Sequence, residues 1–290
     1  MATAARKGVE RPAEGAGPRL PDFVVIGAQR SGTSYLALNL RQHPGIYMAS
    51  RKELHFFTVH FDRGLDWYRR QFADAAPGQV AGEATPLYVY FGDAIERMAR
   101  AIPDARLIVT LRNPVDRAYS HWLKERTRGR EDLSFEEALA AEPERLRGGD
   151  IYDSRKAYAD RGRYLPQLER VARLYPRSSL HVVIFEEMRA EPTATYQQIF
   201  SFLGVDDSFV SPNLATKAQA YRTLRSRSLH RALSKLPRGR ARRSLQRLNY
   251  RRAPAPPMDP ATRARLLEDY REQNAALASW LGRDLDRWDR

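Results

Sequence analysis

The stretch Asp22-Phe23-Val24-Val25-Ile26-Gly27-Ala28-Gln29-Arg30-Ser31-Gly32-Thr33 joins an apolar run to a loop that two glycines bracket. The near-continuous apolar run from Asp22 to Gly27 is typical of a strand that is buried on both faces of a parallel sheet. Helical spacing of apolar residues follows from Ser31 to His43 and stops before Pro44. A strand, a glycine-rich turn and a helix in this order predict the first unit of an α/β fold.

The same alternation continues along the rest of the chain. Strands are predicted at 79–83, 105–111 and 179–185, and helices at 64–72, 91–101, 114–127, 135–141, 164–174, 193–203 and 260–281. Strands that alternate with helices imply βαβ units, whose helices cover both faces of a parallel sheet. We therefore predict a P-loop-like, three-layer α/β fold with a central parallel sheet flanked by helices.

Length and composition predict one large domain. A chain of 290 residues with 42% hydrophobic and 10% aromatic residues can bury a substantial core, which we assign to residues 22–290. Residues 1–21 are predicted to be a flexible leader, because their cations are not followed by the apolar core of a signal peptide. The chain has no cysteine and no apolar run near the roughly 20 residues of a membrane span, so a cytoplasmic location is expected.

The positive charge is concentrated in residues 208–258, which contain thirteen Lys and Arg and no Asp or Glu. Since the whole chain carries +14, the remainder is nearly neutral. Such a segment suggests an anionic partner, either a phosphorylated cofactor, an acidic glycan, a phospholipid surface or a nucleic acid, or else a solvated basic face. Leucines at 224, 229, 233 and 236 lie among its arginines, as in an interfacial amphipathic helix or a helix that covers a ligand.

The loop from Gly27 to Thr33 has the features of an anion site. A glycine-rich turn into a helix directs free N–H groups and the positive end of the helix dipole toward a negative group. The spacing of Gly27 and Gly32 is that of a nucleotide-binding phosphate loop, but Thr33 stands where ATP- and GTP-binding loops need lysine. The cation is Arg30 instead, which argues against a kinase or other NTPase; a purely structural turn is the alternative.

A second anion site is predicted where Arg112 ends the strongest strand. A helix that begins near Pro114 places Ser120 about two turns in, so the two side chains could bind one phosphate. The alternative is an arginine in a surface salt bridge. Two anion sites on neighbouring strand ends describe a ligand with phosphates at both ends of a nucleoside.

These two motifs together resemble the sulfotransferase superfamily. Residues 27–33 resemble its 5′-phosphosulfate loop, and Arg112-Asn113-Pro114-Val115-Asp116-Arg117-Ala118-Tyr119-Ser120 resembles its 3′-phosphate motif. Segments similar to the heparan-sulfate and related carbohydrate enzymes are Lys52-Glu53-Leu54-His55-Phe56-Phe57, Leu65-Asp66-Trp67-Tyr68, Gly82-Glu83-Ala84-Thr85-Pro86 and Gly162-Arg163-Tyr164. The correspondence runs from about Asp22 to Trp288.

The resemblance implies a role for each matching residue. The donor, 3′-phosphoadenylyl sulfate, would be bound without a metal by Gln29, Arg30, Ser31, Gly32, Thr33 and Ser34 at its 5′ end and by Arg112 and Ser120 at its 3′ end, with Tyr164 and Lys217 beside it. Glu53 would be the general base, His55 a neighbouring active-site residue, and Arg30 a cation that stabilises the departing nucleotide. The acceptor is expected to offer a hydroxyl or amine of a glycan, a glycolipid or a secondary metabolite.

Two positions depart from the family pattern. Arg30 stands where the family usually has lysine, and Ala84 where the heparan-type enzymes have a lysine that helps to hold substrate and sulfate. A non-catalytic protein that uses the basic segment 208–258 on a membrane or nucleic acid is the alternative hypothesis. We expect no specific nucleic-acid partner, and expect at most peripheral contact with an anionic membrane.

Overall fold

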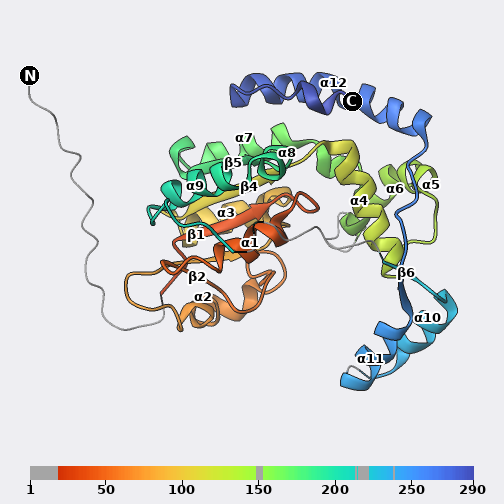
Figure 1. Cartoon of the computed structure of the whole chain (residues 1–290), viewed down its shortest axis with the longest axis horizontal. Coiled ribbons are helices and arrows are strands. Elements are labelled where there is room, and N and C mark those ends of the chain that lie inside the picture. Colours follow the sequence, from red (N-terminus) through yellow and green to blue (C-terminus); the bar gives the residue numbers. More distant parts are fainter. Residues whose placement is uncertain (1–18, 148–152, 213, 215–221, 238) are drawn as a thin grey trace, which may run out of the picture.

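The computed structural model describes residues 19–147, 153–212, 214, 222–237 and 239–290. At its centre lies a sheet of five parallel strands in the order β2-β3-β1-β4-β5 (Figure 1). The strands are β1 (Phe23–Gly27), β2 (Ile46–Met48), β3 (Val80–Ala84), β4 (Arg106–Leu111) and β5 (Leu180–Ile184). This sheet, with helices on both of its faces, confirms the predicted α/β fold.

The helices cover both faces because successive strand residues point in opposite directions. Val24 and Ile26 pack in one buried cluster with helices α3 (Gly92–Ala101), α7 (Tyr164–Leu174) and α12 (Pro260–Leu281). Phe23 and Val25 pack in a second cluster with α1 (Thr33–Leu40) and α9 (Pro192–Leu203). All four of these strand side chains are fully buried, so β1 lies at the centre of the core and its loop leaves from the middle of the sheet edge.

The second predicted motif lies at the start of α4 (Pro114–Thr127). The side-chain oxygen of Asn113 accepts hydrogen bonds from the N–H groups of Val115 and Asp116 at 3.0 and 3.3 Å, and Pro114 at the first helical position has no N–H to satisfy. One face of α4 packs with α5 (Phe135–Ala140) and α12 in a third buried cluster, which includes Trp122 and Phe135. Ser120 lies on another face of α4, which is turned toward the loop after β1.

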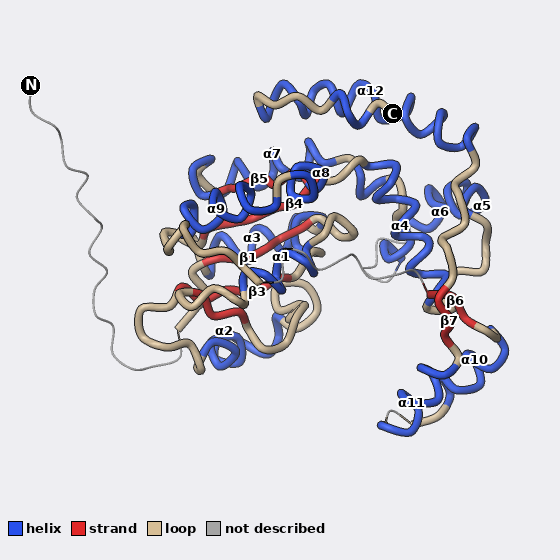
Figure 2. The backbone as a smooth tube through the Cα atoms, viewed as in Figure 1, coloured by secondary structure: helices blue, strands red, loops and turns tan. Residues whose placement is uncertain are grey.

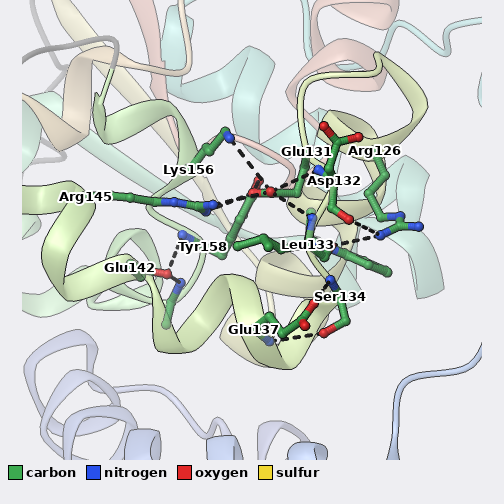
Figure 3. A network of polar contacts seen from close by, with 12 residues as sticks. Arg126, Glu131, Asp132, Leu133, Ser134, Glu137, Glu142, Arg145, Lys156 and Tyr158 are labelled. Atoms are coloured by element: carbon green, nitrogen blue, oxygen red, sulfur yellow. Dashed lines mark hydrogen bonds and ion pairs between the residues drawn. The ribbon is translucent and has the colours of Figure 1, made fainter. Parts of the chain in front are cut away.

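A polar network fixes the chain around α6 (Glu142–Arg147) (Figure 3). The buried Glu131 carboxylate accepts hydrogen bonds from Arg145 at 2.8 Å and from the Tyr158 hydroxyl at 2.9 Å. The Glu142 carboxylate accepts from the consecutive N–H groups of residues 158, 159 and 160 at 2.7–2.8 Å. Residues 158–160 are thereby held against α6, and Arg117 of α4 donates to the Tyr158 carbonyl, so that Arg161 lies beside the site.

Within the basic segment, residues 222–252 form a two-helix projection, which we call the arm. It consists of β6 (Arg222–Leu224), α10 (Arg227–Lys235), α11 (Arg240–Leu248) and β7 (Tyr250–Arg252), and β6 pairs with β7 in antiparallel fashion. Figure 1 and Figure 2 show the arm projecting beyond the end of α4, well away from β1 and α1. Of the two roles suggested by the sequence, this position favours an amphipathic helix at an interface over a helix that covers the Gly27–Thr33 loop.

The predicted elements from Gly64 to Leu203 and the last helix agree with the structure within a few residues; they include α2 (Gly64–Arg69), α4 and α12. The unpredicted elements are β2, α6, α8 (Phe185–Ala190), α11 and the strand pair of the arm. The predicted strand 179–185 runs one residue too far, since Phe185 begins α8. Within the described ranges, no helix has the length and hydropathy that a bilayer crossing requires.

Candidate active site

The loop between β1 and α1 contains two residues with positive φ angles, a backbone conformation that favours glycine. Gly32, the N-cap of α1, has φ +89°, and Arg30 has φ +74°. A Cβ at Gly32 would lie 2.6 Å from a ring carbon of Phe185, so the glycine is required both by its backbone angle and by its neighbour. The result is a tight turn at the carboxyl edge of β1, where ligands bind in open α/β sheets.

The two predicted anion sites meet at Arg30. Its Nε and Nη2 donate hydrogen bonds to Ser120 Oγ at 3.1 and 2.8 Å. Arg112 Nη1 donates to the Arg30 carbonyl at 3.4 Å, and the Tyr164 hydroxyl donates to the Arg112 carbonyl at 2.9 Å. The structure thus brings together the loop, the end of β4 and α4, because β1 and β4 are neighbours in the sheet.

Two further arginines, which the sequence analysis missed, hold the loop through hydrogen bonds to Gln29. Arg117 is fully buried and donates to the carbonyls of Gln29, at 3.4 Å, and Tyr158. Arg161, 3% exposed, donates from Nη1 to Gln29 Oε1 at 2.6 Å. Burial and the nearby Arg117 lower the pKa of Arg161 to about 10, so it remains charged at neutral pH.

The three arginines around the loop form no direct ion pair with a described carboxylate, although the charges of Asp116 and Glu186 act on Arg112 and that of Glu125 on Arg30. Among the described residues, no carboxylate forms an ion pair with Arg30, Arg112 or Arg117. Burial, and then the like charges of Arg112, Arg128 and Arg117, lower the pKa of Arg30 to about 10. Buried charges without a partner are costly, so this cluster is suited to a ligand that carries several negative charges.

The predicted base, Glu53, lies in the loop after β2 and faces the side chains of His55 and Lys52. Glu53 Oε2 is 3.7 Å from His55 Nε2, and Glu53 Oε1 is 3.7 Å from Lys52 Nζ, which also donates a hydrogen bond to Ser34. Glu53 and His55 have φ values of +59° and +54°, a strained geometry that commonly marks functional loops. The backbone N–H of Glu53 donates a hydrogen bond to the Ala84 carbonyl at 3.0 Å, and the N–H of His55 donates to Thr85 Oγ1 at 3.4 Å.

The surroundings of Glu53 favour its ionised form. Contact with His55, together with the charges of Lys124 and Lys52, outweighs partial burial and lowers the pKa of Glu53 to about 2. Glu83, by contrast, is fully buried and accepts hydrogen bonds from Tyr68, Tyr88 and Thr85 at 2.6–3.0 Å. Glu83 therefore acts structurally, by fixing the Thr85 side chain that holds the backbone of His55.

A cavity of about 230 Å³ connects Glu53 to Gln29 of the loop. Its cationic lining comes mainly from α4 and the chain that follows, in Lys124, Arg128 and Arg130. The other lining residues are His55, Val59, His60, Leu87, His121, Glu125, Arg155 and Arg161. A substrate in this cavity would therefore lie between the predicted base and the predicted donor loop, under a strongly positive wall.

Lys124 is the cation of this cavity that the sequence analysis should have found. It lies one helical turn after Ser120, so the spacing already placed both on one face of the predicted helix. Arg128 and Arg130 each lie 3.6 Å from Glu125, whereas no described residue bonds to the Lys124 ammonium. Burial, Arg128 and Arg30 lower its pKa to about 8, against the opposing charges of Glu53 and Glu125.

The remaining predicted site residues divide into two groups. Ser31 and Thr33 are buried at the start of α1 and Tyr164 lies beneath them, all within the loop region. Lys217 lies outside the described residues. The described residues contain no group of three or more His, Asp or Glu side chains arranged to bind a metal ion.

The chain is similar in sequence to proteins of a known family. Residues 20–241 match the family model described as "Sulfotransferase domain". Mouse heparan sulfate glucosamine 3-O-sulfotransferase 3B1 is 32% identical over 192 residues, 66% of this chain and 48% of that protein. Mouse bifunctional heparan sulfate N-deacetylase/N-sulfotransferase 3 is 30% identical over 289 aligned residues, 93% of this chain and 31% of that protein.

A solved structure is similar over nearly the whole chain. The crystal structure of a sulfotransferase from Alicyclobacillus acidocaldarius is 29% identical, with a TM-score of 0.74 over 94% of this chain and 100% of that one. The chain spans about a third to a half of the length of the two mouse relatives.

Proposed function

The chain belongs to the sulfotransferase family, and we propose on this basis that it transfers a sulfuryl group from 3′-phosphoadenylyl sulfate to a hydroxyl or amine. The observation that carries the proposal is the cluster of half-buried Arg30 and Arg112 with buried Arg117, none of which forms an ion pair with a described carboxylate. A donor with a 5′-phosphosulfate and a 3′-phosphate supplies negative charge to this cluster at two points. No metal is needed, because the arginines neutralise the phosphates directly.

Each end of the donor has its own set of residues in this proposal. Gln29, Arg30, Ser31, Gly32, Thr33 and Ser34 bind the 5′-phosphosulfate, using N–H groups at the start of α1 and the hydroxyls of its first turn. Arg112 and Ser120 bind the 3′-phosphate, and Tyr164 holds Arg112 through its backbone carbonyl. The hydrogen bond from Arg30 to Ser120 supports a donor that spans both sets.

In the transfer step, the acceptor oxygen or nitrogen attacks sulfur in line, and the bond between sulfur and the nucleotide phosphate oxygen breaks. Glu53 takes the acceptor proton, and His55 orients the carboxylate. Arg30 stabilises the negative charge that develops on the leaving phosphate, an electrostatic contribution that does not require the arginine to donate a proton. The products are the sulfated acceptor and 3′-phosphoadenosine 5′-phosphate.

A carboxylate with a pKa near 2 is a weak base, and in this proposal donor binding raises the pKa of Glu53. The anionic sulfuryl and phosphate oxygens attract Lys52 and Lys124, which otherwise stabilise the ionised form of Glu53. Their weaker hold on Glu53 raises its proton affinity at the moment when the acceptor is in place. Lys124 then contacts the sulfuryl oxygens from α4, and supplies there the positive charge that the buried Ala84 cannot.

The acceptor proposed first is a carbohydrate, with a glycolipid or secondary metabolite next. The names of the two mouse relatives refer to heparan sulfate and to its glucosamine, which supports a sugar acceptor. The positive wall of the cavity fits an acceptor that carries acidic groups of its own. We propose that the enzyme works in the cytoplasm, in keeping with a chain that has no cysteine to oxidise.

The test is incubation of the full chain with ³⁵S-labelled donor and a panel of glycans, glycolipids and phenols, with products identified by mass. We expect transfer to at least one sugar acceptor and binding of 3′-phosphoadenosine 5′-phosphate by calorimetry. Absence of both transfer and nucleotide binding would overturn the proposal. Nucleotide binding without transfer to any acceptor would instead support the non-catalytic alternative.

A further inference from the structure

The arm, residues 222–252, carries charge of one sign only. Its sequence contains twelve Lys and Arg and no Asp or Glu. Among the described side chains, those of Arg225, Arg231, Lys235, Arg247 and Arg251 are exposed. Figure 2 shows that α10 and α11 extend from the body at the end of α4, away from the sheet; of these five side chains, Arg231 is paired with Asp132 of the body.

The base of the arm is fixed by specific bonds. The Asn249 side chain donates to the Ser226 carbonyl at 2.7 Å and accepts from the Ser226 N–H at 2.9 Å. His230 is 8% exposed and packs against Gly129 of the body, and Arg231 forms a 2.7 Å ion pair with Asp132. These contacts, with the pairing of β6 and β7, set the direction of the arm.

Four leucines on the arm are exposed to solvent. Leu229, Leu236, Leu245 and Leu248 are 47%, 44%, 45% and 73% exposed, and they form four of the nine large hydrophobic side chains that stand out as exposed in the described structure. Leu233, on the same helix as Leu229, is by contrast buried, at 7% exposed. Exposed leucines interspersed with arginines along α10, the residue after it and α11 suit a partner that is both apolar and anionic.

The charge of the arm decides between the possible partners. A second copy of the arm would bring cations against cations, which excludes self-association through this face. A nucleic acid would satisfy the arginines and leave the leucines in water. We propose that the arm docks on the surface of an anionic phospholipid bilayer, with the leucines in the headgroup–acyl boundary and the Lys and Arg side chains at the lipid phosphates.

The position of the base gives this docking a consequence for the cavity. Gly129, which His230 contacts, lies between Arg128 and Arg130, and both of these arginines line the cavity beside Glu53. Docking of the arm therefore sets the distance of the cavity from the membrane surface. This consequence rests on the proposed function, whereas docking itself does not, so the two can be tested separately.

The experiment is sedimentation of the full chain with vesicles of phosphatidylcholine alone or with about 30% phosphatidylglycerol, at about 0.1 M salt. We expect binding to the anionic vesicles only, and release as the salt is raised. The variant L229S/L236S/L245S/L248S should lose at least about tenfold in partition coefficient, because each leucine contributes buried apolar area. The variant R225Q/K235Q/R247Q/R251Q, which leaves the Arg231–Asp132 ion pair in place, should lose the preference for phosphatidylglycerol.

The matched control is L38S/L174S, which removes two leucines that are 40% and 43% exposed on the body. It should bind vesicles as the unchanged chain does, and far-ultraviolet circular dichroism and nucleotide binding should show that all variants are folded. Equal binding of the arm-leucine variant, or equal binding to both vesicle types, would overturn the proposal. So would a salt-sensitive affinity for duplex DNA without vesicle binding, or a dimer that the arm-leucine substitutions dissociate.

Discussion

At the scale of single residues, the carboxylate of Glu53 is held ionised by neighbouring side chains, and in the proposed mechanism the sulfuryl donor later binds two of these, Lys52 and Lys124. His55, Lys52 and Lys124 approach it from two separate segments of the chain, and Ala84 and Thr85 fix the backbone around it. Its carboxylate is thus charged in the free protein at any pH above about 3. Protonation of Glu53 in the free protein therefore does not limit kcat/KM on the acidic side of neutrality.

Substitution Glu53→Gln tests the base directly. We expect the transfer rate to fall by about 10²–10⁴-fold, because the amide cannot accept the acceptor proton. The dissociation constant for 3′-phosphoadenosine 5′-phosphate should change little, as measured by calorimetry. Glu96→Gln, at an exposed carboxylate on α3, is the matched control and should leave both quantities unchanged; substantial turnover by E53Q would contradict the assignment.

Lys124 predicts the alkaline limb of the pH profile. Because its pKa is lowered to about 8, the free enzyme loses this positive charge as the pH rises through 8, and kcat/KM should fall there. Lys124→Arg keeps the charge to higher pH and should move the limb upward, while Lys124→Ala should lower kcat/KM at all pH values. A limb that stays at the same pH in K124R would show that another group causes it.

At the scale of elements, the local order of strand, loop and helix made much of the structure predictable. The strand before Gly27, the start of α4 at Pro114 and the end of α9 at Leu203 each depend on a few adjacent residues. β2 and the strands of the arm have only three residues each, too few for a recognisable pattern. The strand prediction that ended at Phe185 was too long because an apolar residue fits the first turn of α8 as well as the end of β5.

The candidate site was predictable where its residues are consecutive and not where they come from separate segments. The loop at residues 27–33 and the pair Arg112 and Ser120 stood out in the sequence. Arg161 reaches Gln29 because the bonds to Glu142 tie residues 158–160 to α6 and thereby bring Arg161 to the loop. A long-range arrangement of that kind leaves no periodic signal in one sequence.

The start of α1 gives a prediction with an internal control. Gly32→Ala combines a positive φ with a Cβ placed 2.6 Å from Phe185, so we expect a loss of about 1–3 kcal/mol in unfolding free energy and of measurable nucleotide binding. Gly78→Ala also has a positive φ, +82°, but no neighbour within 4 Å of the added Cβ, and should cost about 1 kcal/mol without any effect on binding. Urea denaturation and calorimetry distinguish the two, and equal effects would contradict a steric role for Phe185.

At the scale of the whole molecule, the clustered arginines couple ligand binding to stability. A ligand that binds only the folded state stabilises it by about 2.7 kcal/mol when present at 100 times its dissociation constant. We therefore expect 3′-phosphoadenosine 5′-phosphate to raise the melting temperature by several degrees. Adenosine 5′-phosphate, which lacks the 3′-phosphate, should raise it less, and Arg112→Ala should abolish the difference between the two; equal shifts in the unchanged chain would argue against a 3′-phosphate site.

The pairing of β6 with β7 has a further consequence for how this chain could change over evolutionary time. Because Leu224 lies opposite Tyr250, the chain leaves the body and returns to it at neighbouring points. A tight two-residue turn could close the same gap, so a single deletion or insertion in the gene could remove the arm or exchange it for another. The path of the chain through the sheet, and back along α12, would stay as it is. Whatever the arm binds can thus be altered independently of the chemistry in the cavity.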